Sequence, residues 1–314
     1  NFTSTSFQRK KILIYLLLGS LPLFITGYLQ YFFKINGPFT FLFGLLKWYS
    51  RPIENYDGLS GLFNNANYAG TWLNIILPVS ITFALEKKRN LIYKYFSISI
   101  FLSVVICTLL TYSRNSWFGF IIGLILVTGL NTLRWLLPLL ISISIPVFGS
   151  IGIFPYQSII DFCRKIVPPL IWDYKLISIG FDTFSQYGRF EIWIAAYKFI
   201  LERPIWGWGA ASFPVLFEIK TDLWKGHAHN LPLELAVSYG IVATLLVFSA
   251  VILILIKSKK ILLNKKFEDI NYDDSWWACS LLILLSQMFD VQYFDIRVGL
   301  IFWILLSGLR NIKS

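Results

Sequence analysis

Charged residues are scarce in this sequence of 314 residues. They make up 14% of the chain, whereas hydrophobic residues make up 56% and aromatic residues 18%. Soluble domains carry roughly a quarter charged residues, because polar groups must cover much of their surface. A mean hydropathy of +0.64 exceeds what the core of a globule of this size accommodates. The composition therefore excludes a soluble protein and indicates a membrane protein.

Cysteine is rare, and several common catalytic motifs are missing. The three cysteines have no paired spacing, which excludes a disulfide scaffold and a thiolate zinc site. The sequence has no Walker A loop, no dinucleotide-binding fingerprint, no HExxH and no Gly-x-Ser-x-Gly elbow. It also has no signal peptide with a small-residue cleavage site. Nothing in the chain therefore points to a P-loop enzyme, a zinc protease or a serine hydrolase.

What the sequence does contain is a series of long apolar stretches. A helix of about 17 to 25 apolar residues crosses a hydrocarbon core roughly 30 Å thick. Eight stretches approach that length, so we predict an all-α fold, a polytopic membrane helical bundle that forms one integral-membrane domain over residues 1–314. The stretches are Ile12–Phe33, Asn67–Leu85, Tyr95–Tyr112, Ser116–Leu133, Trp135–Phe154, Asn230–Ile256, Ser275–Phe289 and Val298–Leu309.

Basic residues fall in alternate connectors between these stretches. The positive-inside rule places such connectors in the cytoplasm, so we expect both termini there and a long loop, residues 155–229, on the outer face. The net charge of +11 is then an orientation signal and not a nucleic-acid footprint. Because the chain begins without Met, we expect it to be the C-terminal part of a longer protein. The basic groups are Arg9 to Lys11, Lys87 to Arg89 with Lys94, Arg134, Lys257 to Lys266, and Arg310 with Lys313.

The long outer loop contains a predicted amphipathic helix. From Tyr187 to Arg203 the apolar residues recur at spacings of three and four, which suits a helix lying at the membrane interface. Pro204 ends this helix, and Gly207 and Gly209 follow in a predicted turn.

Four short motifs gather on the predicted outer face. They are expected to place Asn67 at the cap of the second span, Arg114 at the start of the fourth, Arg189 in the first turn of the loop helix, and Asn230 at the cap of the sixth. Helix N-termini carry unpaired N–H groups and positive partial charge, and arginine offers a planar fork of donors. Together these groups suit a pyrophosphate.

Simpler interpretations stay open for each of these residues. Arg114 also suits a contact with lipid headgroups, and Arg189 also suits the solvated face of its helix, paired with Glu191 or Glu202. The asparagines Asn64, Asn65 and Asn67 also suit turns and caps alone. The many tryptophans and tyrosines are typical of an interfacial belt.

His227 and His229 are the only histidines in the chain. A His-x-His pair can bind a metal, but no third or fourth ligand of the right type lies nearby in the sequence, so we expect no metal site. A histidine beside an anion-binding face suits a general base, because its ordinary pKa lies close to neutral pH.

The four motifs together resemble a known family. GLFNNANYAG, TYSRNSWFG, GRFEIWIAAYKFILERPIWGWGAASF and GHAHNLPLELAVSYGIVA, in that order and on one membrane face, are similar to the O-antigen ligase and O-antigen polymerase superfamily, the Wzy-C domain. The similar region extends from about Gly58 to Val242. The resemblance implies a metal-independent, inverting glycosyltransferase of the GT-C type in the bacterial inner membrane, without a cofactor, that builds surface polysaccharide such as lipopolysaccharide on the periplasmic face.

The resemblance also implies a donor, an acceptor and residue roles. The donor is a glycan on undecaprenyl pyrophosphate, and the acceptor is a hydroxyl of a glycan, a lipid core or a protein. Arg114 and Arg189 would hold the pyrophosphate, and His229, or else His227, would activate the acceptor hydroxyl. Substrate binding is assigned to His227, Asn230, Asn67, Asn64, Trp193 and Glu234.

Two other classes of function compete with glycan transfer. One is a membrane transporter for a small anion such as bicarbonate, which should show ionisable residues at mid-membrane, broken helices or inverted repeats. The other is a flippase or a scaffold within an export system, in which the motifs serve structure only. Within glycan transfer, the sequence does not separate a ligase from a polymerase or a protein O-glycosyltransferase.

Overall fold

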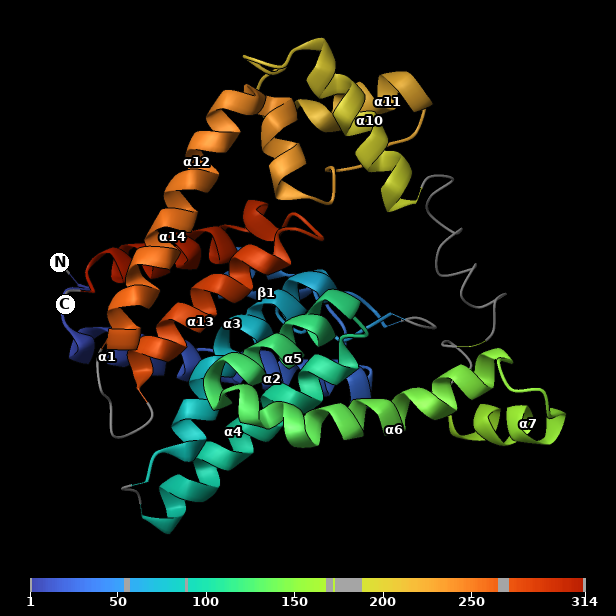
Figure 1. The fold of residues 1–314 in the computed structure, drawn as a ribbon, viewed down its shortest axis with the longest axis vertical. Coiled ribbons are helices and arrows are strands. Elements are labelled where there is room, and N and C mark those ends of the chain that lie inside the picture. The colour runs from blue at the N-terminus through green and yellow to red at the C-terminus, as the bar shows by residue number, and fades with distance from the viewer. Residues whose placement is uncertain are drawn as a thin grey trace. The chain divides into compact units, whose positions relative to one another are not determined.

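The computed structural model describes residues 2–53, 57–87, 90–167, 172, 188–264 and 271–312. These residues are mostly helical, with one short antiparallel hairpin, so the all-α prediction is confirmed (Figure 1). The helices are α1 (Ser6–Leu18), α2 (Leu21–Phe33), α3 (Ala66–Leu85), α4 (Leu91–Leu110), α5 (Arg114–Thr128), α6 (Leu133–Ile151), α7 (Gln157–Ile166), α10 (Arg189–Glu202), α11 (Ser212–Thr221), α12 (Leu231–Asn264), α13 (Tyr272–Ser286) and α14 (Ile296–Arg310). Short elements are β1 (Phe39–Phe41), β2 (Leu46–Trp48), and the 3₁₀ turns η1 (Leu42–Gly44), η2 (Leu130–Thr132) and η3 (Gln292–Phe294).

Several of these helices are long and apolar enough to cross a membrane. Within the described residues there are five such stretches: Ser6–Phe33, Ala66–Leu85, Leu91–Leu110, Leu130–Ile151 and Leu231–Asn264. The other three predicted spans form α5, α13 and α14, which have 15 residues each. Every predicted span therefore contains a helix, and the number that cross the membrane stays a prediction.

Local residues explain where the helices depart from the predicted boundaries. The first stretch breaks at Gly19 and Ser20, and Pro22 lies in the first turn of α2, where a missing N–H is tolerated. Helix α5, the fourth predicted span, ends at Thr128, because Gly129 adopts a positive φ of 85°. The predicted cap at Asn67 was wrong by two residues: Asn65 caps α3 by accepting a hydrogen bond from the Asn67 N–H over 2.7 Å.

The described chain forms two compact units. The first comprises residues 1–127 and 192–314, and the second comprises residues 128–191. In the second unit α6 packs on α7, where Cys163 lies against Gly149 and the Arg164 Nε atom donates to the Ser150 carbonyl over 3.0 Å. The predicted outer loop, residues 155–229, extends over both units, and residues 168–171 and 173–187 of it lie outside the described part.

Helix α3 is the centre of the first unit, packed against α1, α4 and α13. Small residues allow close approach, as at Gly119, which lies against Asn74, and Gly308, which lies against the ring of Trp276. The buried Trp276 indole donates to the Leu305 carbonyl over 2.7 Å, which ties α13 to α14. In lipid the hydrophobic effect does not drive helices together, so close van der Waals packing at small residues contributes to their association.

Ion pairs gather several of the predicted cytoplasmic segments at one end of this unit. Arg9 of α1 pairs with Asp273 of α13 over 2.8 Å, and both side chains are almost fully buried. At the same end Lys10 contacts Glu86, and Lys259 contacts Asp274. The alternation of connectors predicted from the sequence agrees with this grouping. Lys88, Arg89, Lys265, Lys266 and Lys313 lie outside the described residues.

Candidate active site

A histidine and an aspartate form a hydrogen-bonded pair at the other end of the first unit. The Nδ1 atom of His229 lies 2.9 Å from Oδ1 of Asp290. Asp290 follows α13 and its side chain is only 3% exposed, whereas the His229 side chain is 29% exposed. The Nε2 atom of His229 makes no hydrogen bond to the described protein. This pair therefore presents one ring nitrogen to a ligand while the carboxylate orients the other, as in the histidine and aspartate of a catalytic triad.

The start of α12 fixes the position of His229. The residue adopts the left-handed conformation, with φ of 52°, and turns the chain directly into the helix. Asn230 caps α12 as predicted, because its side-chain oxygen accepts from the Leu233 N–H over 3.0 Å. Its side-chain amide also donates to the Met288 carbonyl over 2.9 Å. Asn230 thus holds the turn formed by residues 227–229, called the histidine turn below, against the end of α13.

His227 has a supporting geometry. Its Nδ1 atom accepts a hydrogen bond from the His229 backbone N–H over 3.2 Å, and its Nε2 atom lies 3.6 Å from Asp290 Oδ1. A neutral imidazole has one donor and one acceptor nitrogen. Since Nδ1 is the acceptor, the proton resides on Nε2 and faces the carboxylate. Both nitrogens of His227 are therefore occupied within the protein, which favours His229 as the base.

Asp290 is held in its charged form. Burial alone would raise its pKa, but the hydrogen bond from His229, the electrostatic interaction with both histidines and the Val291 N–H lower the pKa below the ordinary value. The backbone bond to Val291 is 3.0 Å long. An ionised carboxylate at this position fixes the His229 tautomer with the proton on Nδ1.

Asp290 is also the third possible metal ligand that the sequence did not show beside the two histidines. One ligand atom from each of His227, His229 and Asp290 lies within 4.8 Å of the others. The hydrogen bonds favour a dyad over a metal centre, because a His227 that accepts at Nδ1 carries its proton on the nitrogen that would have to bind the metal. The expectation of no metal stays a prediction.

Polar contacts join the first turns of α3 and α5 to the end of α13. Ser113 donates to the Asn67 side-chain oxygen over 2.8 Å, and its own oxygen accepts from the Ser116 N–H at the start of α5. Asn115 donates to the Ser286 hydroxyl over 2.9 Å, and that hydroxyl lies 2.6 Å from Thr71. Three helix N-termini, those of α3, α5 and α12, therefore converge on the segment that carries Asp290.

Arg114 lies at the start of α5, as predicted, and is exposed. Arg114 therefore lies at one of the three converging helix N-termini, where an anion is favoured. Arg189 is the first residue of α10 and is exposed. It belongs to the second unit, and its role stays a prediction. Tyr187, the predicted start of its helix, lies outside the described residues.

The remaining predicted site residues occupy two places. Asn64 and Asn67 line a polar cavity of about 220 Å³ together with Arg51 and Asp57. Trp193 lies half-buried on α10, and its indole N–H has no acceptor among the described residues.

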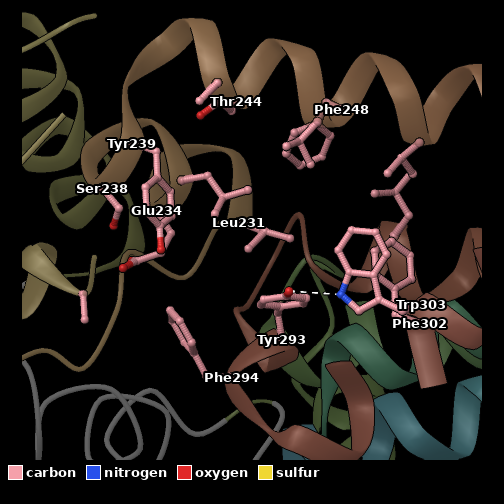
Figure 2. A pocket seen from close by; sticks show the side chains of 16 residues that line it. Leu231, Glu234, Ser238, Tyr239, Thr244, Phe248, Tyr293, Phe294, Phe302 and Trp303 are labelled. Carbon is pink, nitrogen blue, oxygen red and sulfur yellow. Dashed lines mark hydrogen bonds between the residues drawn. The ribbon is translucent and has the colours of Figure 1, made fainter. Parts of the chain in front are cut away.

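Glu234 connects the histidines to a larger cavity. Its Oε2 atom accepts from the N–H of Ala228, between the two histidines, over 2.8 Å. The residue is 1% exposed, and its other oxygen, Oε1, has no hydrogen-bond partner in the described part of the chain. Glu234 also lines a cavity of about 330 Å³ (Figure 2).

That cavity is enclosed mainly by apolar and aromatic side chains from α12, α14 and η3. Figure 2 shows the rings of Phe248, Phe294, Phe302 and Trp303 around the open space, with the Glu234 carboxylate at its edge. The Trp303 indole donates to the Tyr293 hydroxyl over 3.2 Å, which fixes two of the rings. Ser238, Tyr239 and Thr244 add hydroxyl groups to the lining.

Asp290 was not among the site residues predicted from the sequence. It lies 61 positions after His229 and belongs to none of the four motifs. A signal was present, because Asp290 follows a predicted span and falls in the outer connector before the last one. An acid at the same membrane face as the two histidines is a candidate partner for them.

Comparison with known protein families gives a match to one family model. A family model described as O-Antigen ligase, Wzy_C, matches residues 98–248. No curated protein matches the chain. The matched segment extends from α4 into α12 and includes Arg114, Arg189, both histidines and Glu234. Asp290, which completes the dyad, lies beyond it.

Proposed function

We propose that the protein transfers a glycan from a polyprenyl pyrophosphate to an acceptor hydroxyl. The O-antigen ligase family model that matches residues 98–248 supports a glycosyltransferase-like role in surface polysaccharide synthesis at a membrane. The observation that carries this proposal is the dyad of His229 and Asp290, which lies where three helix N-termini converge.

In the proposed reaction, Nε2 of His229 takes the proton from the acceptor hydroxyl. The hydroxyl oxygen then forms a bond to the anomeric carbon of the donor sugar, on the face opposite the pyrophosphate, so the configuration inverts. The bond from that carbon to the pyrophosphate oxygen breaks, and its electron pair leaves with the pyrophosphate. The products are the glycosylated acceptor and polyprenyl pyrophosphate, and the proton stays on His229. A positioned base of this kind contributes about 10²- to 10⁴-fold in rate.

The leaving group needs stabilisation as its charge develops. Arg114 and the N–H groups at the start of α5 supply positive charge that is fixed before the reaction begins. Arg189 is proposed as the second guanidinium. Neither contribution requires a metal ion, and the lipid carrier explains why the site belongs to a membrane protein.

The break in α12 bears on the transporter alternative. Transporters use broken helices to coordinate ions with free backbone groups, and α12 is broken at Gly240, with φ of 82°. Here the loop after α10 occupies those groups: the Ile241 N–H donates to the Pro204 carbonyl, and the Gly209 N–H donates to the Ser238 carbonyl. The break is therefore a joint between two segments of chain, which favours surface chemistry over an ion pathway.

The proposal is tested by analysing cell-surface glycans in a deletion strain complemented with variants. Wild type should restore the glycan, whereas His229→Ala and Arg114→Ala should each abolish it at unchanged protein level in the membrane. Lys47→Ala, an exposed cation on β2, serves as the control for Arg114. Full restoration by both site variants would contradict the proposal. Loss of all polymer would indicate a ligase, and caps of a single repeat would indicate a polymerase.

A further inference from the structure

The cavity beside the dyad contains one polar group that the protein leaves unsatisfied. Glu234 is 1% exposed, and its Oε1 atom has no hydrogen-bond partner among the described residues, whereas Oε2 is held by the Ala228 N–H. A buried carboxylate oxygen without a donor is costly. Since Glu234 lines the cavity (Figure 2), a ligand in the cavity can provide the missing donor.

The two ends of the expected donor substrate do not match this requirement. A polyprenyl chain has no hydrogen-bond donor, so it would leave the carboxylate oxygen buried and unpaired. A pyrophosphate is an anion, and a carboxylate repels it. The ligand must therefore carry a hydroxyl or an amine and must also have an apolar surface for the surrounding rings.

We propose that this cavity is the acceptor subsite and that it binds a sugar whose hydroxyl donates to Oε1 of Glu234. A sugar ring has apolar C–H faces, which pack on aromatic rings such as Trp303 and Phe302, and hydroxyls at its rim, for which Thr244 and Ser238 are further partners. The volume of about 330 Å³ lies at the lower end of the ~300 to 1,000 Å³ that ligand sites occupy.

The position of Glu234 relative to the base supports an acceptor over any other sugar. The Ala228 N–H that Glu234 binds lies between the two histidines in the chain, and the Glu234 carboxylate interacts electrostatically with His229. A hydroxyl-bearing ring held at Glu234 is thus next to the residue proposed to deprotonate the acceptor. The assignment of the sugar as the acceptor rests on the proposed function. The binding of a sugar in the cavity does not.

Direct binding tests the inference without requiring transfer. The protein in lipid nanodiscs is titrated with hexyl β-glucoside, with hexyl phosphate as the anionic probe that has the same chain. We expect hexyl glucoside to bind and hexyl phosphate not to bind. Glu234→Gln keeps an oxygen for the Ala228 N–H and places an amide donor in the cavity, so it should weaken glucoside binding roughly tenfold, the effect of losing one good hydrogen bond to a charged group.

A second pair of variants tests the cavity without changing the hydrogen bond between Glu234 and the Ala228 N–H. Trp303→Ala removes a ring of the cavity, and Trp135→Ala removes a similarly exposed ring from α6, since the two are 52% and 53% exposed. Trp303→Ala should weaken glucoside binding, and Trp135→Ala should not. Binding of hexyl phosphate, or glucoside binding that neither Glu234→Gln nor Trp303→Ala weakens, would overturn the inference. If glucoside binds as expected but no glycan is transferred, the proposed function fails and the sugar site stands.

Discussion

At the residue scale, the dyad fixes the orientation of the His229 ring. The Asp290 carboxylate, almost fully buried, faces Nδ1 of His229 at 2.9 Å and leaves Nε2 as the acceptor. In a neutral imidazole this arrangement leaves the Nε2 lone pair available to a hydroxyl proton. The histidine turn, the cap at Asn230 and the end of α13 hold this geometry together, so the chemistry depends on three elements and not on one motif.

Replacing Asp290 by Asn should impair transfer while leaving the fold in place. The amide has the shape of the carboxylate but lacks its charge, so it neither stabilises the imidazolium nor fixes the tautomer. We expect kcat to fall by about 10²- to 10⁴-fold with little change in the donor KM. Purified Asp290→Asn and wild-type protein would be compared in a transfer assay at several donor concentrations. An unchanged kcat would show that Asp290 does not position the base.

The lowered pKa of Asp290 predicts a pH dependence of stability. The folded state favours the charged carboxylate, so its contribution is fully present above the ordinary aspartate pKa of about 3.9. The contribution is lost as the pH falls through the lower folded-state value. Thermal unfolding in detergent should therefore show wild type losing stability over this acidic range more steeply than Asp290→Asn. Identical slopes for the two proteins would contradict the assigned shift.

At the element scale, helix α12 changes direction because another segment interrupts its hydrogen bonds. The loop after α10 fits into the break at Gly240, where a Cβ atom would lie 2.0 Å from the Ile205 carbonyl oxygen. The sequence predicts one continuous span there, because the residues on either side are largely apolar. A break caused by contacts some 30 residues away in the chain leaves no signal in local hydrophobicity.

Gly240→Ala should therefore destabilise the protein strongly. The positive φ costs about 1 to 3 kcal/mol for a residue with a Cβ atom, and the collision with the Ile205 backbone adds to it. Gly209→Ala is the matched control, because Gly209 also has a positive φ, of 105°, but nothing lies within 4 Å of its Cβ position. Thermal unfolding in detergent should show a larger loss for Gly240→Ala. Equal losses would mean that the joint with Ile205 is not tightly packed.

The helices themselves were largely predictable, and the dyad was not. Long apolar runs fixed α3 and α4 to within a few residues, and the capping role of Asn230 followed from its place before Pro232. Helix α12 begins where it was predicted but extends to Asn264, beyond the predicted end at Ile256. The pairing of Asp290 with His229 could not be predicted, because it depends on how the start of α12 packs against the end of α13. Such packing joins segments that are distant in the sequence. The unpaired oxygen of Glu234 likewise became visible only with its surroundings.

At the scale of the whole molecule, the first unit has two chemically different ends. One end carries the buried pair of Arg9 and Asp273 and further lysine contacts. The other carries the dyad, the helix N-termini and both cavities. In the proposed orientation the first end would face the cytoplasm and the second end would face the periplasm.

The predicted sidedness can be tested by labelling single cysteines. Cys107, Cys163 and Cys279 are buried and would be replaced by Ser. Asn64→Cys should then react with a membrane-impermeant maleimide from the periplasmic side in spheroplasts. Lys87→Cys, at the opposite end, should react only after the membrane is permeabilised. The reverse pattern would invert the orientation and place the dyad in the cytoplasm.

Glycan transfer by the purified protein tests the central claim most directly. The protein would be reconstituted in liposomes with a polyprenyl-pyrophosphate-linked glycan and a hydroxyl acceptor, and the glycosylated product and the released polyprenyl pyrophosphate would both be measured. We predict that wild type forms the two products in equal amounts, with inversion at the anomeric carbon, and that His229→Ala forms neither above background. Equal transfer by wild type and His229→Ala, or retention of configuration, would contradict a direct displacement in which His229 is the base.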